Sequence, residues 1–307
     1  MHNPRIIFFG MEGLFSRAPL LELLHAQIDV RAVIVPRPAQ SRAASTPIRL
    51  LPPAAAHRSD VPLFSDQHEK NIIRIAWDAN IQIYEVDRFN DSQTLATLHA
   101  LRADVICVTC FPFILPQLLI TNYVSLNLHP SLLPSYRGPS PLFWIFHDGL
   151  ENAGVTLHLI DEHADTGDIV AQEQITLPDG IRYTDAERIC SEQGARLMVE
   201  ALRLIESEKL SRSPQTKIAA PRAPSPSEKD YIITPAWSVR RAFNFIRGMG
   251  EGNLKLEIGN SRFVFNEAIE YTTGGKSSEA KEKIGEHWKI RFADGTLLCS
   301  IIPISNL

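Results

Sequence analysis

The sequence predicts an α/β fold, with a doubly wound, mostly parallel open sheet of Rossmann-like type followed by a small β-rich, barrel-like C-terminal domain. Two features predict it. Strand-like and helix-like segments alternate through residues 1–205 of the 307-residue chain, as in open α/β sheets. A proline-rich stretch then precedes short segments rich in β-branched and aromatic residues. We therefore expect an α/β domain over residues 1–205, a linker over residues 206–229 and a β-rich domain over residues 230–307.

The first residues are typical of a β-α-β unit. Residues 5–9 (RIIFF) form a continuous apolar run, residues 17–27 place apolar side chains at helical spacing, and residues 29–35 are strand-like again. Because crossovers between parallel strands are right-handed, this unit predicts a parallel sheet. Residues 36–60 then break the pattern. They are rich in Pro, Ala, Ser and Arg, which is typical of a long mobile loop or lid.

Strands and helices continue to alternate after this loop. Asp91 or Ser92 can cap a helix, and Gly149 is placed to end another. The expected helices cover residues 67–80, 91–102, 116–121, 141–149 and 184–204. The expected strands cover residues 81–85, 105–110, 124–128, 154–160 and 169–175. This order again predicts an open α/β sheet.

The C-terminal third has a different composition. Residues 206–229 contain four prolines among Ser, Lys and Arg, as linkers often do. A helix is expected at about residues 235–248. It is followed by the short strand-like segments LKLEI, RFVFNEAIEY, HWKIRFA and TLLCSII. We expect these to form the small barrel-like domain.

Bulk composition excludes several classes of protein. Charged residues make up 21% of the chain and the formal net charge is −4, which carries no strong polyanion-binding signature. The first residues lack the basic and apolar regions of a secretory signal, and no stretch approaches the length of a membrane span. We therefore expect a cytoplasmic protein without a membrane partner.

The four cysteines include one CxxC pair, Cys107 and Cys110, inside the strand-like run ADVICVTCFPF. Residues three apart on a strand face opposite sides, so the two sulfurs cannot share a metal or a disulfide without a bend. We expect two buried structural thiols and no metal site.

The stretch LNLHPSLLPSYRG (126–138) is the first candidate for chemistry. Asn127 and His129 occupy alternate positions at the end of a strand, so they share one face. Asp165 lies just past the end of another strand, in the acidic turn DEHADTGD. Ligands of open α/β sheets gather outside the carboxyl ends of strands. An amide and a protonated imidazole can donate to an oxyanion, while a carboxylate can hold the imidazole and accept a proton.

Spacing alone favours structural roles for this trio, with Asn127 capping the turn, His129 filling a polar gap and Asp165 ending a strand. However, SLNLHPSLLPSYRG followed by GVTLHLIDEHADTGDIVAQ resembles the signature of the 10-formyltetrahydrofolate-dependent formyltransferase family. The family pattern is Asn-x-His, Ser-Leu-Leu-Pro, Arg/Lys-Gly and a later Asp-x-Gly. The opening RIIFFGMEGLFSRAPLLELL and the C-terminal module resemble the rest of such enzymes more weakly.

The resemblance implies a catalytic domain over residues 1–205 in which Asn127, His129 and Asp165 are catalytic and no metal is needed. An acceptor amine would attack the formyl carbon of the cosubstrate 10-formyltetrahydrofolate. The implied folate-binding residues are Phe113, Ile114, Leu115, Ser131, Leu132, Leu133, Pro134, Asp161, Glu162 and Ala164. The implied acceptor-binding residues are Gly10, Met11, Glu12, Arg137 and Gly138.

Several residues allow an interpretation other than formyl transfer. The turn Gly10-Met11-Glu12-Gly13 lacks the G-x-G-x-x-G spacing of a dinucleotide site. We expect His158 to be a packing residue and Trp144 to lie in the core. The arginines of the 36–60 loop either contact nucleic-acid phosphate or are solvated charges. They are Arg37, Arg42, Arg49 and Arg58.

The acceptor is less clearly marked than the formyl chemistry. SYRGPSPLFW and GVTLH are closer to formyltransferases that act on nucleotide-linked amino sugars, so we interpret the acceptor as a small-molecule amine. Methionyl-tRNA formyltransferase is the alternative, because the length, linker and C-terminal module agree with it, and tRNA would then be the partner. A 10-formyltetrahydrofolate hydrolase or a non-catalytic folate-binding protein is the second alternative. The oligomeric state stays open.

Overall fold

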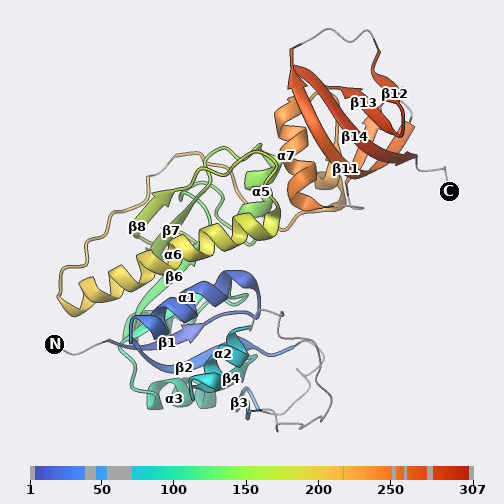
Figure 1. Ribbon diagram of the computed structural model, residues 1–307. Helices are drawn as coiled ribbons and strands as arrows, with labels where there is room; N and C mark the ends of the chain where they lie inside the picture. Colours follow the sequence, from blue (N-terminus) through green and yellow to red (C-terminus); the bar gives the residue numbers. More distant parts are fainter. Residues whose placement is uncertain are drawn as a thin grey trace, which may run out of the picture. The chain divides into compact units, whose positions relative to one another are not determined.

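The computed structural model describes residues 4–38, 46–53, 71–216, 218–250, 254–258, 261–274 and 279–303 (Figure 1). The chain folds into two compact units. The first unit comprises Met1–Pro134, Val155–Glu173 and Arg188–Ile218, and the second comprises Ser135–Gly154, Gln174–Glu187 and Ala219–Leu307. Both units therefore draw on separated parts of the sequence.

The first unit contains an eight-stranded sheet with the strand order β3-β4-β2-β1-β5-β6-β7-β8. Its strands are β1 (Arg5–Phe9), β2 (Asp29–Pro36), β3 (Ile48–Leu50), β4 (Gln82–Val86), β5 (Val105–Thr109), β6 (Val124–His129), β7 (Gly154–Leu159) and β8 (Ile169–Gln174). The five strands β4, β2, β1, β5 and β6 pair in parallel, whereas β3 and β7 are antiparallel to their neighbours β4 and β6. The predicted mostly parallel α/β sheet is confirmed.

Helices connect these strands in the predicted order, and the long helix α6 follows the last of them. They are α1 (Leu14–His25), α2 (Ile72–Asp78), α3 (Ser92–Ala100), α4 (Gln117–Asn122) and α6 (Tyr183–Glu206). Asp91 is the N-cap of α3, as expected, and its side chain accepts a hydrogen bond from the backbone of Gln93.

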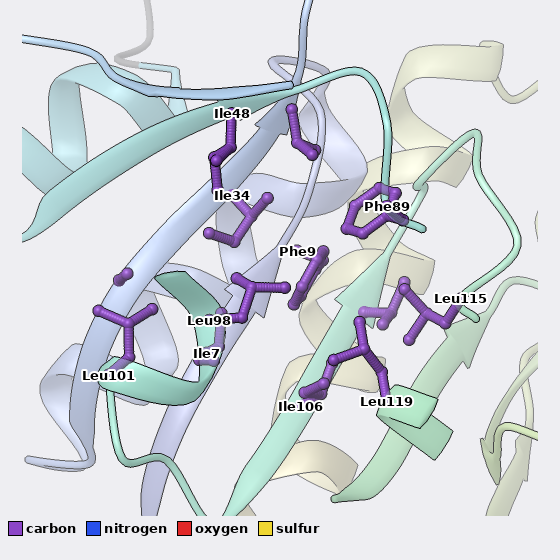
Figure 2. Close-up of a cluster of buried hydrophobic side chains, with 13 residues drawn as sticks. Ile7, Phe9, Ile34, Ile48, Phe89, Leu98, Leu101, Ile106, Leu115 and Leu119 are labelled. Carbon is purple, nitrogen blue, oxygen red and sulfur yellow. The ribbon is translucent and has the colours of Figure 1, made fainter. Parts of the chain in front are cut away.

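The core on one side of this sheet is built from the apolar runs of the central strands. Figure 2 shows Ile7 of β1 beside Leu98 of α3, and Ile106 of β5 beside Leu119 of α4. Phe9 of β1 contacts the ring of Phe89, with the two centroids 5.8 Å apart. Burial of side chains from several strands and helices in one cluster holds the carboxyl ends of β1 and β5 in place.

The arginine-bearing region after β2 differs from the predicted loop. Residues 48–50 form β3, and the side chain of Arg37 is fully buried in an ion pair with Asp87, with 3.1 Å between nitrogen and oxygen. Arg49 pairs with Glu85 on the neighbouring strand β4. Arg37 is therefore a buried structural residue and neither a phosphate contact nor a solvated charge, whereas the Arg49 side chain is 45% exposed in its ion pair. Arg42 and Arg58 lie outside the described residues.

The expectation for the CxxC pair is wrong for one of its members. Cys107 lies in β5 and is buried, and burial raises the pKa of its thiol. Cys110 is exposed, because β5 ends at Thr109 and Cys110 turns out of the strand with φ = 48°. The described part of the chain holds no cluster of three His, Cys, Asp or Glu residues suited to a metal ion.

The second unit contains a six-stranded sheet with the order β12-β13-β14-β11-β10-β9. Its strands are β9 (Ile232–Ile233), β10 (Lys255–Ile258), β11 (Ser261–Thr273), β12 (Lys281–Ile284), β13 (His287–Arg291) and β14 (Gly295–Pro303). Its helices are α5 (Pro141–His147), the short 3-10 helix η2 (Glu228–Tyr231) and α7 (Val239–Met249). Trp144 of α5, expected in the core, is half-buried, and its indole nitrogen donates to the Pro224 carbonyl. The second, β-rich domain is confirmed.

The segment predicted as a linker forms backbone hydrogen bonds with residues of both units. Ser213 and Ile169 exchange two backbone hydrogen bonds in the first unit. Further along, Ala223 bonds to Arg137 and Ser140 in the second unit.

Within the described residues, no helix combines the length and apolarity of a membrane span.

Candidate active site

The site is built on the end of β6, which carries Asn127 and His129. Strand β5 pairs with it in parallel and strand β7 in antiparallel register, with Asn127 opposite His158 and His129 opposite Thr156. Because side chains alternate along a strand, Asn127 and His129 project to the same face. The chain then turns at once, and the backbone nitrogen of Ser131 donates to the His129 carbonyl.

Asp165 joins these two residues from the loop after β7. Its Oδ1 lies 3.7 Å from His129 Nδ1, and the amide Nδ2 of Asn127 donates to the same oxygen at 3.4 Å. His129 is buried, with 5% of its surface exposed, while the Asp165 side chain retains 14%. The amide, imidazole and carboxylate that the sequence singled out therefore converge at one point.

A fourth residue, His158, belongs to this cluster although we expected it to be a packing residue. Its Nε2 lies 3.0 Å from Asn127 Nδ2 and 3.7 Å from Asp165 Oδ1. Its Nδ1 lies 2.7 Å from the Leu159 carbonyl, which can only accept a hydrogen bond. We therefore assign the proton to Nδ1, so that the neutral ring accepts from Asn127 through Nε2.

The position of His158 follows from the register between β6 and β7. It is 31 residues from Asn127 in the chain, and only the antiparallel pairing sets the two side by side. The motif GVTLH, which ends in His158, resembles formyltransferase sequences. The motif alone does not show which residue His158 faces.

The loop that carries Asp165 is held by its own side chains. Asp161 Oδ1 accepts from the backbone of His163 and from the Thr166 hydroxyl, at 3.1 and 2.6 Å. Asp165 itself has φ = 58°, a left-handed conformation that Asp tolerates better than most residues. At Gly167 a Cβ atom would lie 1.9 Å from the Leu159 carbonyl oxygen, so only glycine fits. Asp161 therefore shapes the loop, while Glu162 and Ala164 are exposed.

The turn after His129 is held by hydrogen bonds from side chains of β7 and β8. The Thr156 hydroxyl donates to the Ser131 carbonyl at 2.6 Å and accepts from the Leu133 backbone at 3.1 Å. Gln172 Nε2 donates to the Leu133 carbonyl at 2.9 Å. Ser131 and Leu133 are buried, whereas Leu132 and Pro134 are half-buried. Their fixed backbone is what this turn can offer a ligand.

The segment after β5 combines buried and exposed side chains. Leu115 belongs to the core, and the Phe113 ring contacts those of Phe89 and Phe111 at centroid distances of 5.7 Å (Figure 2 shows Leu115 and Phe89). Ile114 is 69% exposed. An exposed aliphatic side chain on an anchored loop is suited to contact a planar ligand.

The turn after β1 is tied to the same edge of the sheet. Gly10 donates to the Ile34 carbonyl at 3.1 Å, and a Cβ at Gly10 would approach Phe8 to 2.9 Å. The backbone of Met11 donates to the Ser16 hydroxyl. Glu12 accepts from the Asn71 side chain, and the Met11 side chain is exposed.

The other two expected acceptor-binding residues, Arg137 and Gly138, belong to the second unit. Gly138 has φ = 126°, and a Cβ there would lie 2.5 Å from the Ala223 carbonyl oxygen. The Arg137 backbone forms a bridge with Arg222. The close approach of the Ala223 backbone therefore explains why residue 138 is a glycine, and no ligand contact is needed for that.

Residues 5–237 match the Formyl transferase family model. The methionyl-tRNA formyltransferase of Syntrophus aciditrophicus is 29% identical over 231 residues, 74% of each chain. That of Pelotomaculum thermopropionicum is 31% identical over 247 residues, covering 80% of this chain and 72% of the relative.

Two solved structures share the fold at low identity. WlaRD, a sugar 3N-formyl transferase crystallised in the presence of dTDP and 5-N-formyl-THF, is 20% identical with a TM-score of 0.62 and full coverage of both chains. HypX from Aquifex aeolicus in complex with tetrahydrofolic acid is 18% identical with a TM-score of 0.59; the match covers 97% of this chain and 44% of HypX. The family match spans well over half of the sequence, and so this chain belongs to the formyl transferase family of enzymes.

Proposed function

We propose that this enzyme transfers the formyl group of 10-formyltetrahydrofolate to a primary amine by direct attack through a tetrahedral intermediate. The observation that carries this proposal is the convergence of Asn127, His129 and Asp165 at the end of β6. Membership of the family supports formyl transfer. The cosubstrate is supported by tetrahydrofolic acid in the HypX complex and by 5-N-formyl-THF, in the presence of which WlaRD was crystallised.

The amine nitrogen attacks the formyl carbon, and the carbonyl oxygen becomes an oxyanion. Protonated His129 donates one hydrogen bond to it. Asn127 donates another, because one of its amide hydrogens is directed at His158 and the second makes only a long contact of 3.4 Å with Asp165. Donors of this kind, fixed before the reaction, lower the barrier by about 2.7–4 kcal/mol each.

Asp165 supports the protonated form of His129, because a carboxylate near an imidazolium favours the charged ring. Collapse of the intermediate breaks the bond between the formyl carbon and N10 of the folate. The proton lost by the attacking amine goes to N10, and Asp165 is placed to relay it. The products are the formylated amine and tetrahydrofolate, so atoms and charges balance.

The folate is proposed to lie against the three loops that follow β5, β6 and β7, at residues 113–115, 131–134 and 161–164. All three loops belong to the first unit. The loops after β5 and β6 follow the carboxyl ends of parallel strands, where open α/β sheets bind ligands. The loop after the antiparallel strand β7 comes to the same place through Asp165, which lies beside Asn127 and His129. Residues 10–12, at the end of β1, are proposed to contact the acceptor.

For the acceptor, we propose a small amine such as a nucleotide-linked amino sugar. Two of the four arginines that would have supported tRNA binding, Arg37 and Arg49, are engaged in ion pairs within the fold. Methionyl-tRNA remains the second candidate, because the sequence relatives quoted above are methionyl-tRNA formyltransferases.

The test is a transfer assay with 10-formyltetrahydrofolate and one acceptor at a time. We expect turnover with nucleotide-linked amino sugars and none with charged initiator Met-tRNA at low or moderate salt. Efficient transfer to Met-tRNA that weakens with salt would establish the second candidate. Cofactor consumption without any amine would identify a hydrolase.

The same assay tests the assigned chemistry. Asn127→Ala should lower kcat by about 10²–10³-fold, the usual cost of removing one oxyanion donor. Unchanged turnover in this variant would refute the proposed mechanism.

A further inference from the structure

A glutamine in the proline-rich segment contacts the loop that carries Asp165. The side-chain nitrogen of Gln215 donates to the Asp165 carbonyl at 3.0 Å and to the Gly167 carbonyl at 2.7 Å. Gln215 is 50 residues from Asp165 in the chain, and both belong to the first unit. A single NH2 group has two hydrogens, so it can serve both carbonyls at once.

The contact is part of a longer attachment. Ser213 and Ile169 exchange backbone hydrogen bonds of 2.8 and 2.9 Å, and the Arg212 guanidinium lies 3.6 Å from the Asp168 carboxylate. The segment therefore runs beside residues 165–169, and Gln215 is its side-chain contact with the loop backbone at Asp165.

The two carbonyls belong to residues whose backbone conformation or surroundings few residue types tolerate. Asp165 is left-handed, and Gly167 lies so close to Leu159 that no side chain fits. Such conformations persist where the surroundings hold them. The carboxylate of Asp165 faces His129 and Asn127. A hydrogen bond that fixes the backbone carbonyl of Asp165 therefore also orients its carboxylate.

We infer that Gln215 is a positioning residue, which holds the backbone of Asp165 so that its carboxylate meets His129 and Asn127. This inference rests on the proposed function for its catalytic consequence, because Asp165 acts on the reaction through those two side chains. Misplacing a catalytic group by about 1 Å can cost about 10²-fold in rate.

The kinetic test uses Gln215→Met, which keeps the length of the side chain and removes both donors. We expect kcat to fall about 10- to 100-fold, while KM for 10-formyltetrahydrofolate changes less than about twofold. Thr216→Val, at the exposed neighbour in the same segment, is the matched control and should keep the parental rate. Should Gln215→Met fail to fold, Gln215→Asn keeps the amide on a shorter chain and should show a smaller fall.

A double variant separates positioning from a general structural effect. If Gln215 acts through Asp165, then Gln215→Met combined with Asp165→Asn should be within about twofold of Asp165→Asn alone, because coupled residues are not additive. A multiplicative loss in the double variant would overturn the inference.

A second readout does not depend on formyl transfer. In protein labelled with ¹⁵N-histidine, free of substrates, Gln215→Met should move the imidazole signals of His129 toward those of Asp165→Asn. The signals of His25, on the exposed side of α1, should stay unchanged. Unchanged His129 signals in Gln215→Met would overturn the inference even if formyl transfer is confirmed, and shifted signals would support it even if another acceptor chemistry is found.

Discussion

Asn127 shows how a single amide is oriented by its neighbours. Its nitrogen lies 3.0 Å from His158 Nε2 and 3.4 Å from Asp165 Oδ1. The proton of His158 is held on Nδ1 by the Leu159 carbonyl, so the other ring nitrogen is free to accept. The amide therefore has one defined orientation before any substrate binds, which is the preorganisation that oxyanion donors need.

His158→Leu should lower both activity and stability. The variant leaves a donor of Asn127 without its acceptor, which typically reduces the free energy of unfolding by about 1–3 kcal/mol. The amide is then free to rotate, so we expect kcat to fall at least tenfold, about 1.4 kcal/mol in barrier. Urea unfolding and steady-state kinetics check this, with His25→Leu as the exposed control. Full activity in His158→Leu would return His158 to a packing role.

Arg37→Leu should destabilise the first unit without acting on the reaction directly. The variant leaves the Asp87 carboxylate, 6% exposed, without its buried cation. Breaking a buried pair on one side usually costs about 3–5 kcal/mol. Denaturant unfolding at neutral pH measures the loss, and Arg37→Leu with Asp87→Leu should recover most of it. A stable Arg37→Leu variant with weakened tRNA binding would instead restore the phosphate-contact interpretation.

At the scale of elements, the site depends on how helix α6 lies against strand β6. Gly194 of α6 faces Leu128, which stands between Asn127 and His129 in the strand. A Cβ at residue 194 would lie 2.4 Å from Leu128 Cδ2, and Leu128 is 1% exposed. The absence of a side chain on the helix therefore sets the position of the strand that carries the site.

Gly194→Ala should be destabilising, although alanine is the better helix former. Helix propensity favours the variant by about 0.5–1 kcal/mol, whereas overpacking of a buried contact costs about 1–3 kcal/mol. We expect a net loss of about 1 kcal/mol and a lower kcat, because β6 must move. Thermal unfolding and kinetics measure both effects. Gly194→Ala with Leu128→Val, which shortens the opposing side chain, should relieve them; a stabilised single variant would contradict the packing argument.

At the scale of the whole molecule, each of the two units has its own sheet and its own polar network. In the second unit, Asp179 accepts hydrogen bonds from Tyr271 of β11 and from Arg240 and Asn244 of α7. Partial burial by itself would raise the pKa of Asp179, but these three hydrogen bonds outweigh it and lower the pKa. The network connects the loop before α6 to the helix and sheet of this unit.

Because of this network, the stability of the second unit should depend on pH in the acidic range. The folded-state pKa of Asp179 lies below its unfolded value of about 3.9, so the stabilisation is present above about pH 4 and is lost as pH falls through the folded-state pKa. Asp179→Asn should therefore be less stable at pH 7 and should flatten the dependence of unfolding free energy on pH below about pH 5. Tyr271→Phe, which removes one of the three donors, should show part of the effect. An unaltered pH dependence in Asp179→Asn would contradict this account.

The sequence by itself determined most strands and helices of both units, because apolar runs, helical spacing and alternation along a strand are readable over a few residues. The α/β sheet and the β-rich C-terminal domain were predicted for that reason. The sequence did not mark the short strands β3, β9 and β12. Helix boundaries were less accurate, as α1 covers Leu14–His25 whereas residues 17–27 were expected. The trio Asn127, His129 and Asp165 was predicted from the resemblance to the formyltransferase signature, because spacing alone favoured structural roles.

Only the tertiary structure decided which distant residues meet. His158 faces Asn127 because β7 pairs with β6 in one register, and a shift of one residue would turn it to the other side of the sheet. Gln215 reaches Asp165 from a segment whose composition predicts only a linker. Burial of Arg37 and exposure of Cys110 likewise depend on the packing around them. Register and burial are set by contacts between segments far apart in the chain, and local patterns carry no record of those contacts.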